Sequence, residues 1–162
     1  MPTGSTAISM FGAGCFWGVE ETFRTTPGVV ATAVGYSGGH LANPTYRDVC
    51  AGGSGHAEVV RVEFDESRIS YDALLEVFWG AHDPTTPNRQ GPDVGAQYRS
   101  VIFTFSEAQA QAAREAKART QSSGRFTRPI VTLIEPAREF YRAEENHQQY
   151  VQKRGVVHCR VP

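Results

Sequence analysis

The sequence predicts an α+β fold, on two observations. Apolar and polar residues alternate over 56–65, with Val60, Val62 and Phe64 on one side, which is typical of a half-buried strand. The predicted elements follow in the order β-α-β-β-α-β-α-β-α, which does not alternate strictly and so disfavours a doubly wound parallel sheet. At 162 residues the chain has room for one domain, which we expect to span 1–162 with a mobile tail from about residue 154.

Local signals place each element in turn. Gly28 ends the first predicted helix, and Ser70 and Ser106 are typical N-caps of the next two. We expect strands over 6–11, 29–35, 56–65, 101–105 and 129–134, and helices over 15–24, from 70 through Trp79, over 106–121 and over 143–153. The loops over 36–55 and 83–97 are long for a compact domain, so we expect them to carry function.

Composition and charge exclude several classes of function. With 16 Lys+Arg against 17 Asp+Glu, the chain has no basic excess to follow a nucleic-acid backbone. It has no apolar stretch long enough to span a bilayer, and residues 1–8 do not resemble a signal peptide. We therefore expect a cytoplasmic monomer without nucleic-acid or membrane partners.

The three cysteines are Cys15, Cys50 and Cys159. Three is an odd and small number, which disfavours a disulfide framework, and no two of them have the spacing of a zinc knuckle. We therefore expect no bound metal and no bound cofactor. In this setting each cysteine is either an inert core thiol or a reactive one.

The segment 12–18, GAGCFWG, joins a predicted strand to a predicted helix. Its glycine spacing does not fit a dinucleotide-binding loop, which would need glycine where Trp17 stands. Cys15 lies instead at a helix N-terminus, where backbone N–H groups and the helix dipole stabilise a thiolate. The alternative is a buried, inert cysteine beside two core aromatic residues, Phe16 and Trp17.

Several motifs decide between these readings. Residues 14–18 (GCFWG) resemble the signature of the A-type peptide methionine sulfoxide reductases, which act on the S epimer of the sulfoxide. Further matches run in order along the chain: 35–39 (GYSGG), 43–46 (NPTY), 55–58 (GHAE), 82–86 (HDPTT), 93–100 (DVGAQYRS) and 143–150 (AEENHQQY). The resemblance implies a two-layer α/β sandwich with a mixed, mainly antiparallel sheet, a ferredoxin-like core and long functional loops.

The resemblance also implies roles for individual residues. Cys15 would be the nucleophile and Glu58, on a strand with apolar neighbours, the general acid. Tyr46 and Tyr98 would donate hydrogen bonds to the sulfoxide oxygen, and Asp93 would anchor the site through water. Phe16 and Trp17 would enclose the S-methyl group. This chemistry needs a thiolate, a proton donor and an apolar pocket, because an unprotonated oxygen is a poor leaving group.

A sulfenic acid on Cys15 requires a second thiol to resolve it. We expect Cys159 to do so because it lies near the C-terminus, where the chain can rearrange, although Cys50 is an alternative. The family then implies recycling by thioredoxin, or by dithiothreitol in vitro. Many relatives carry a longer tail with two late cysteines, whereas this chain ends at Pro162.

Three other functions compete with this one. A Cys/His hydrolase or acyltransferase would use Cys15 with His147. A binding module would take methionine-containing peptides on Phe16 and Trp17 without turnover. A metalloprotein would need a histidine cluster that the sequence does not show, and His56 and His82 are expected to support loops.

Overall fold

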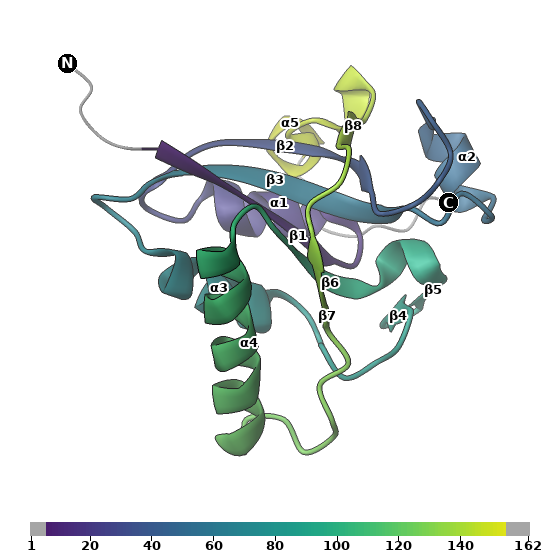
Figure 1. Ribbon diagram of the computed structural model, residues 1–162. Helices are drawn as coiled ribbons and strands as arrows, with labels where there is room; N and C mark the ends of the chain where they lie inside the picture. The colour runs from purple at the N-terminus through teal and green to yellow at the C-terminus, as the bar shows by residue number, and fades with distance from the viewer. Residues whose placement is uncertain (1–5, 155–162) are drawn as a thin grey trace.

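The computed structural model of the protein describes residues 6–154 (Figure 1). Its strands are β1 (Thr6–Ala13), β2 (Val29–Ser37), β3 (Ala57–Asp65), β4 (Arg89–Gln90), β5 (Asp93–Val94), β6 (Ser100–Thr104), β7 (Leu133–Pro136) and β8 (Tyr141–Arg142). Its α-helices are α1 (Phe16–Arg24), α2 (Tyr46–Cys50), α3 (Tyr71–Ala81), α4 (Glu107–Ser122) and α5 (Tyr150–Arg154). Short 3-10 helices cover Ala96–Tyr98 and Glu145–His147.

The main sheet has the strand order β7-β6-β1-β3-β2-β8, and β4 pairs with β5 in a separate hairpin. Only β6 and β7 are parallel among the described pairs of the main sheet. The four central strands, β6-β1-β3-β2, are connected by α1 after β1 and by α3 after β3, which is the ferredoxin-like arrangement. The prediction of a mixed, mainly antiparallel α+β sheet is confirmed.

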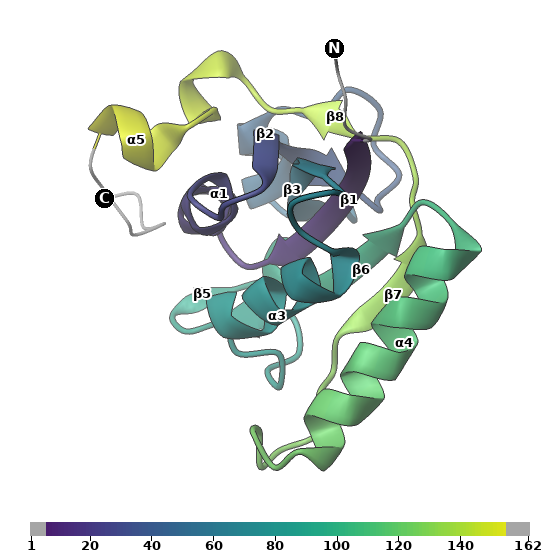
Figure 2. The ribbon, with the colours of Figure 1, turned by 90° about the vertical axis from the view of Figure 1, so that its left-hand side faces the viewer.

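The sheet has two differently covered faces. On one face, Phe11, Val60 and Val62 join a core cluster with residues of α1, α3 and α4. Figure 2 shows α1 and α3 packed beside the central strands, with α5 outside α1. On the other face, Met10 and Phe103 belong to a smaller cluster against which the chain leading into β8 packs. The period-two burial of the strands therefore produces the two layers.

The predicted helix starts and the central strands agree with the structure. Ser70 accepts a hydrogen bond from the Ala73 N–H at 3.0 Å, and Ser106 accepts one from the Gln109 N–H at 3.1 Å. Each hydroxyl satisfies one N–H that the first helical turn leaves unpaired. None of the helices in the described part of the chain is long and apolar enough to cross a membrane.

Two predicted elements are wrong in position or type. The predicted helix over 143–153 is a 3-10 turn followed by α5, which begins only at Tyr150. The reason is Gln149, whose φ of 50° is left-handed and cannot continue an α-helix. The strand expected over 129–134 is β7 at 133–136, because the Ile130 and Val131 N–H groups bond to Gln121 and Pro84 and not to β6.

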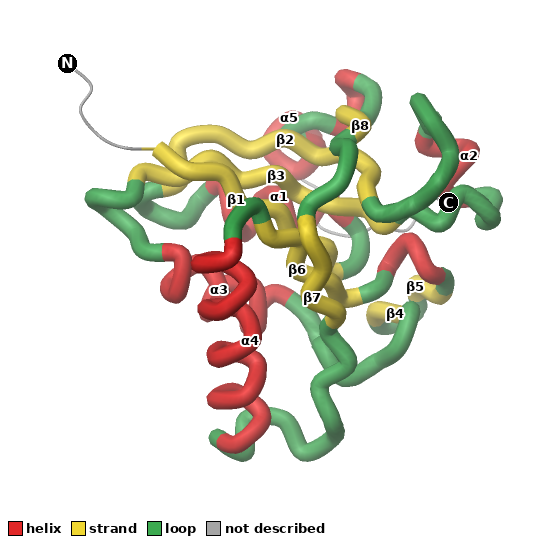
Figure 3. Tube along the Cα trace, viewed as in Figure 1, coloured by secondary structure: helices red, strands yellow, loops and turns green. Residues whose placement is uncertain are grey.

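The two long loops contain short elements that the sequence did not predict. Figure 3 shows the connection between α3 and β6 as mostly loop, interrupted by β4, β5 and the 3-10 helix Ala96–Tyr98. Helix α2 interrupts the other loop, and Thr45 caps it by accepting a hydrogen bond from the Asp48 N–H. Both loops lie at the same end of the sheet, on the right in Figure 1, where β1 and β2 end and β3 and β6 begin.

Candidate active site

The register of the antiparallel strands brings the site residues to this end of the sheet. Ser37 at the end of β2 pairs with Ala57 at the start of β3, and Tyr36 pairs with Glu58. Ala13 at the end of β1 pairs with Ser100 at the start of β6, two residues after Tyr98. Pairing partners project to the same face, so Tyr36 and Glu58 are neighbours beneath α1.

Cys15 is the N-cap residue of α1. The helix was predicted to begin at Cys15 and begins one residue later, at Phe16. Gly14 makes the turn from β1 with a φ of 98°, and a Cβ on it would come within 2.6 Å of the Gln90 side chain. The loop carrying β4 and β5 therefore packs directly beside the cysteine. Cys15 is 8% exposed and disulfide-bonded, whereas Cys50 is a free, exposed cysteine. Cys159 lies outside the described residues.

Glu58 is a buried carboxyl group, 1% exposed, next to this helix terminus. Its Oε1 accepts a hydrogen bond from the Phe16 N–H at 3.1 Å, while Oε2 has no hydrogen-bond partner among the described residues. Burial raises the pKa of Glu58 to about 8, against the lowering effect of the Phe16 N–H and with a further increase from the Asp93 charge. The desolvation of the charged form outweighs the single donor, so Glu58 carries a proton at neutral pH.

Three tyrosines surround this carboxyl group. Burial raises the pKa values of Tyr36, Tyr46 and Tyr98, and the charge of Glu58 raises each of them further. The three phenols therefore stay neutral and remain hydrogen-bond donors. The Asp93 charge raises the pKa of both Glu58 and Tyr98, so Asp93 lies near the cluster.

Cys50 belongs to the same cluster. Although Cys50 is exposed as a residue, partial burial of its thiol raises the pKa, the Tyr46 phenol lowers it through a hydrogen bond, and the Glu58 charge raises it again. Cys50 and Tyr46 lie at the two ends of α2, one helical turn apart. Apart from its short distance along the chain from Tyr46 and Glu58, nothing in the sequence predicts that Cys50 belongs to this cluster.

An aromatic wall stands beside Cys15. The Trp17 indole is stacked on the Tyr150 ring, with centroids 3.9 Å apart, and its Nε1–H donates to His147 Nδ1 at 2.9 Å. The Tyr46 ring lies 6.2 Å from Phe16, 6.1 Å from Trp17 and 4.4 Å from His147. The structure thus brings together the predicted Phe16 and Trp17 with two aromatic side chains from the C-terminal segment.

Sequence reasoning missed Tyr36 and Tyr150 as parts of the site. Tyr36 is fully buried in the glycine-rich 35–39 motif, and its hydroxyl is 3.5 Å from Glu144 Oε1. Its strand partner is Glu58, so a correct pairing of β2 with β3 would have found it. Tyr150 closes the late 143–150 motif, but the motif alone does not say which face of a helix it occupies.

Two histidines support the loops around the site. His56 Nδ1 accepts the Gly39 N–H at 3.0 Å, and its Nε2 is 2.7 Å from the Leu41 carbonyl oxygen. His82 bridges the Phe78 carbonyl and the Ser100 hydroxyl at 2.9 and 2.7 Å. Within residues 6–154, no three His, Cys, Asp or Glu side chains are grouped so that they could hold a metal ion.

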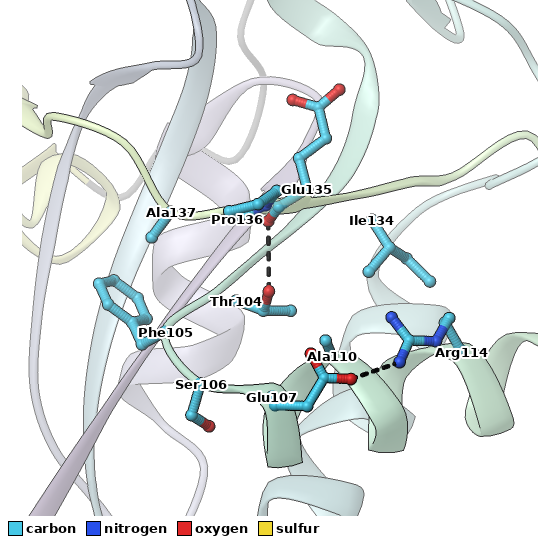
Figure 4. A pocket seen from close by; sticks show the side chains of 10 residues that line it. All are labelled: Thr104, Phe105, Ser106, Glu107, Ala110, Arg114, Ile134, Glu135, Pro136 and Ala137. Carbon is cyan, nitrogen blue, oxygen red and sulfur yellow. Dashed lines mark hydrogen bonds and ion pairs between the residues drawn. The ribbon is translucent and has the colours of Figure 1, made fainter.

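A cavity of about 490 Å³ lies away from these residues (Figure 4). It is bounded by β6, the start of α4 and β7, and an Arg114–Glu107 ion pair at 2.8 Å stands at its edge. None of the residues assembled around Cys15 and Glu58 lines it. The cavity therefore does not contribute to the arrangement described above.

Comparison with known proteins agrees with the site geometry. Residues 7–162 match the family model described as peptide methionine sulfoxide reductase. A peptide methionine sulfoxide reductase MsrA of Methanoculleus marisnigri is 62% identical over 159 residues, which cover 98% of this chain and 97% of the relative. That of Methanothermobacter thermautotrophicus is 63% identical over 149 residues, which cover 92% and 88%.

Solved structures give the same result. The reduced form of Mxr1 from Saccharomyces cerevisiae superposes with a TM-score of 0.88 at 36% identity, covering 96% of this chain and 88% of that one. Methionine sulfoxide reductase A of Corynebacterium diphtheriae superposes with a TM-score of 0.85 at 42% identity, covering 95% and 77%. By sequence and by fold, the chain belongs to the A-type peptide methionine sulfoxide reductases.

Proposed function

We propose that this chain reduces the S epimer of methionine sulfoxide, free or within proteins, with Cys15 as nucleophile and Glu58 as general acid. The observation that carries the assignment is the burial of Glu58 beside Cys15. Its carboxyl group accepts a hydrogen bond from the N–H of Phe16, the residue that follows Cys15. A protonated carboxyl at this position is able to supply the proton that the departing sulfoxide oxygen needs.

In the first step, the Cys15 thiolate attacks the sulfoxide sulfur and forms an S–S bond, while the S–O bond breaks and the oxygen takes a proton from Glu58 and leaves as hydroxide. The hydroxide then attacks the Cys15 sulfur and breaks the S–S bond. The sulfoxide sulfur gains two electrons and Cys15 loses two, which leaves methionine and a sulfenic acid on Cys15. Tyr46 and Tyr98 donate hydrogen bonds to the oxygen, and Asp93 anchors the site through water. Phe16 and Trp17 enclose the methyl group, to which apolar burial contributes about 1 kcal/mol.

In the second step, a thiol condenses with the sulfenic acid, forming a disulfide and releasing water. We assign this role to Cys159. Support comes from the pairing state of the other cysteines, because Cys15 is disulfide-bonded while Cys50 is free. A thioredoxin dithiol then reduces the disulfide and is itself oxidised. A structure of Mxr1 in complex with Trx2 superposes on this chain with a TM-score of 0.64 at 26% identity, and covers 93% of this chain and 87% of that one.

The alternative Cys/His hydrolase is disfavoured by the hydrogen bonding of His147. Its Nδ1 accepts the Trp17 indole N–H, so in the neutral ring the proton is on Nε2 and neither nitrogen is available as a base. Burial also lowers the pKa of His147. With only three cysteines and a need for a thiol reductant, we further propose a cytoplasmic location.

The direct test is turnover of the separated S and R epimers of a blocked methionine sulfoxide with dithiothreitol. We expect reduction of the S epimer only, and its complete loss in Cys15→Ser. A folded native chain that reduces neither epimer would overturn the proposed function and turn attention to the peptide-binding alternative.

The resolving role has its own test. Cys159→Ser is expected to complete one stoichiometric turnover but to lose cycling with thioredoxin, because its sulfenic acid meets no partner thiol. Cys50→Ser is the matched control and is expected to cycle normally. Unimpaired cycling of Cys159→Ser would move the role to Cys50 or to an external thiol.

A further inference from the structure

Besides Glu58 on β3, a second buried carboxyl group lies on helix α1, and the proposed chemistry does not use it. Glu20 is 1% exposed and lies one helical turn after Trp17. Its Oε2 accepts the Thr32 hydroxyl at 2.7 Å. A carboxyl group this deeply buried destabilises a protein unless its oxygens accept hydrogen bonds, so the other partners of Glu20 are informative.

Those partners both come from Gln149, at the far end of the chain. The Gln149 backbone N–H donates to Glu20 Oε1 at 2.8 Å, and its side-chain Nε2 donates to Oε2 at 2.6 Å. Gln149 has a φ of 50°, a conformation that a non-glycine residue adopts only when its surroundings fix it. Glu20 therefore holds both the backbone and the side chain of one strained residue.

The preceding residue fixes the same segment to the sheet. The Gln148 side chain accepts the Val34 N–H at 2.8 Å and donates to the Val34 carbonyl at 2.9 Å. It thus binds both backbone groups of Val34 at the edge of β2, beside the Ala143 N–H, which donates to the same carbonyl at 3.0 Å. Two adjacent glutamines consequently clamp this segment onto β2 and α1, which agrees with the position of α5 outside α1 in Figure 2.

The clamped residues are flanked by the two that hold Trp17. His147 accepts the indole N–H at 2.9 Å, and the Tyr150 ring lies parallel to the indole within 7°. Both the hydrogen bond and the stack depend on how residues 147–150 are placed relative to α1. Glu20 connects that segment to the helix that bears Cys15 and Trp17.

We infer that Glu20 and Gln149 are positioning residues for substrate binding: they hold His147 and Tyr150 against Trp17 and so set the wall of the methyl pocket. This inference rests on the proposed function, since it assigns Trp17 to the methyl group. Glu20 and Gln149 are not placed in contact with the reacting atoms, so replacing them is expected to change substrate binding and not the chemical step.

The test uses Glu20→Gln, which keeps the size of the side chain. In either orientation of the new amide, its NH2 group replaces an oxygen that accepted a hydrogen bond from Gln149. The double variant Glu20→Gln/Gln149→Glu reverses the side-chain pair and restores one amide-to-carboxylate hydrogen bond between the two positions. It does not restore the bonds that the Thr32 hydroxyl makes to Glu20 and the Gln149 amide makes to the Thr32 carbonyl. Glu21→Gln is the matched control, because Glu21 is on the same helix but pairs with Arg24 at the surface.

Two readouts separate positioning from general stability. With dithiothreitol and the S epimer, Glu20→Gln is expected to raise KM roughly tenfold and to leave kcat within about twofold. In a Trp79→Phe background, where Trp17 is the remaining tryptophan, its emission is expected to shift to longer wavelength as the Tyr150 contact loosens. The double variant is expected to recover part of each change, and Glu21→Gln to change neither.

An unchanged KM and emission in folded Glu20→Gln, with only a lower melting temperature, would overturn the inference. If Glu20→Gln does not fold, Gln149→Ala replaces it, since it retains the Glu20–Thr32 bond and removes one side-chain donor. It is expected to raise KM about threefold to fivefold, and an unchanged KM there would likewise overturn the inference. If the native chain reduces no sulfoxide, the proposed function fails, while the emission shift still tests the clamp.

Discussion

Glu58 and Glu20 are equally buried, yet their surroundings suit them to opposite tasks. Glu58 receives one backbone N–H, lies near the Asp93 charge, and has an oxygen without a hydrogen-bond partner within the described residues. Glu20 receives three donors, from Thr32 and Gln149, on both of its oxygens. The first arrangement favours a carboxylic acid, whereas in the second both oxygens serve as hydrogen-bond acceptors.

The difference shows that burial alone does not assign a role to a carboxyl group. At Glu58, desolvation raises the pKa against a single donor, whereas at Glu20 three donors occupy the two oxygens. The single donor at Glu58 comes from the N-terminus of α1, which also favours a thiolate at Cys15. In the proposed mechanism, one helix terminus therefore serves an acid and a nucleophile side by side.

The largest effect on turnover is expected from removing the proton that Glu58 carries. Glu58→Gln keeps the shape of the side chain and an acceptor for the Phe16 N–H but cannot transfer a proton. Turnover of the S epimer is expected to fall by roughly 10²-fold or more. Steady-state kinetics at saturating dithiothreitol measure this, and an unchanged rate would remove the assignment of Glu58 as the acid.

At Glu20, a smaller effect is expected, and it concerns the stability of the fold. Glu20→Ala leaves three donors without their acceptor, so the free energy of unfolding is expected to fall by about 2 to 3 kcal/mol. Glu21→Ala loses only a surface ion pair with Arg24 and is expected to cost under about 1 kcal/mol. Urea denaturation of the native chain and the two variants provides the measurement. Equal midpoints for both variants would show that the hydrogen bonds of Glu20 to Thr32 and Gln149 contribute no stability.

Much of the fold was predictable because its signals are local. Ser70 and Ser106 cap their helices as expected, and the alternation around Val60 and Val62 predicts which face of β3 is buried. The 143–150 segment was not predictable in this way. Its conformation depends on Gln148 bonding to Val34, which is 114 residues earlier, and on Gln149 bonding to Glu20.

The candidate site shows the same division. The motifs around Cys15, Glu58 and Tyr98 predict which residues matter, and the sheet register brings them to one end of the molecule. Tyr36 escaped prediction because its role depends on being the strand partner of Glu58. Tyr150 escaped because its stack on Trp17 depends on the clamp and not on its own sequence neighbours.

The most direct test of the account is the pH dependence of kcat/KM for the S epimer, compared between the native chain and Glu58→Gln. Because the pKa of Glu58 is raised to about 8, the acid is protonated below that pH and is lost as the pH rises through it. The account predicts that native kcat/KM declines above about pH 8, and that Glu58→Gln loses this decline together with most of its activity. A native profile that stays level from pH 7 to 10, or a decline that persists unchanged in Glu58→Gln, would contradict it.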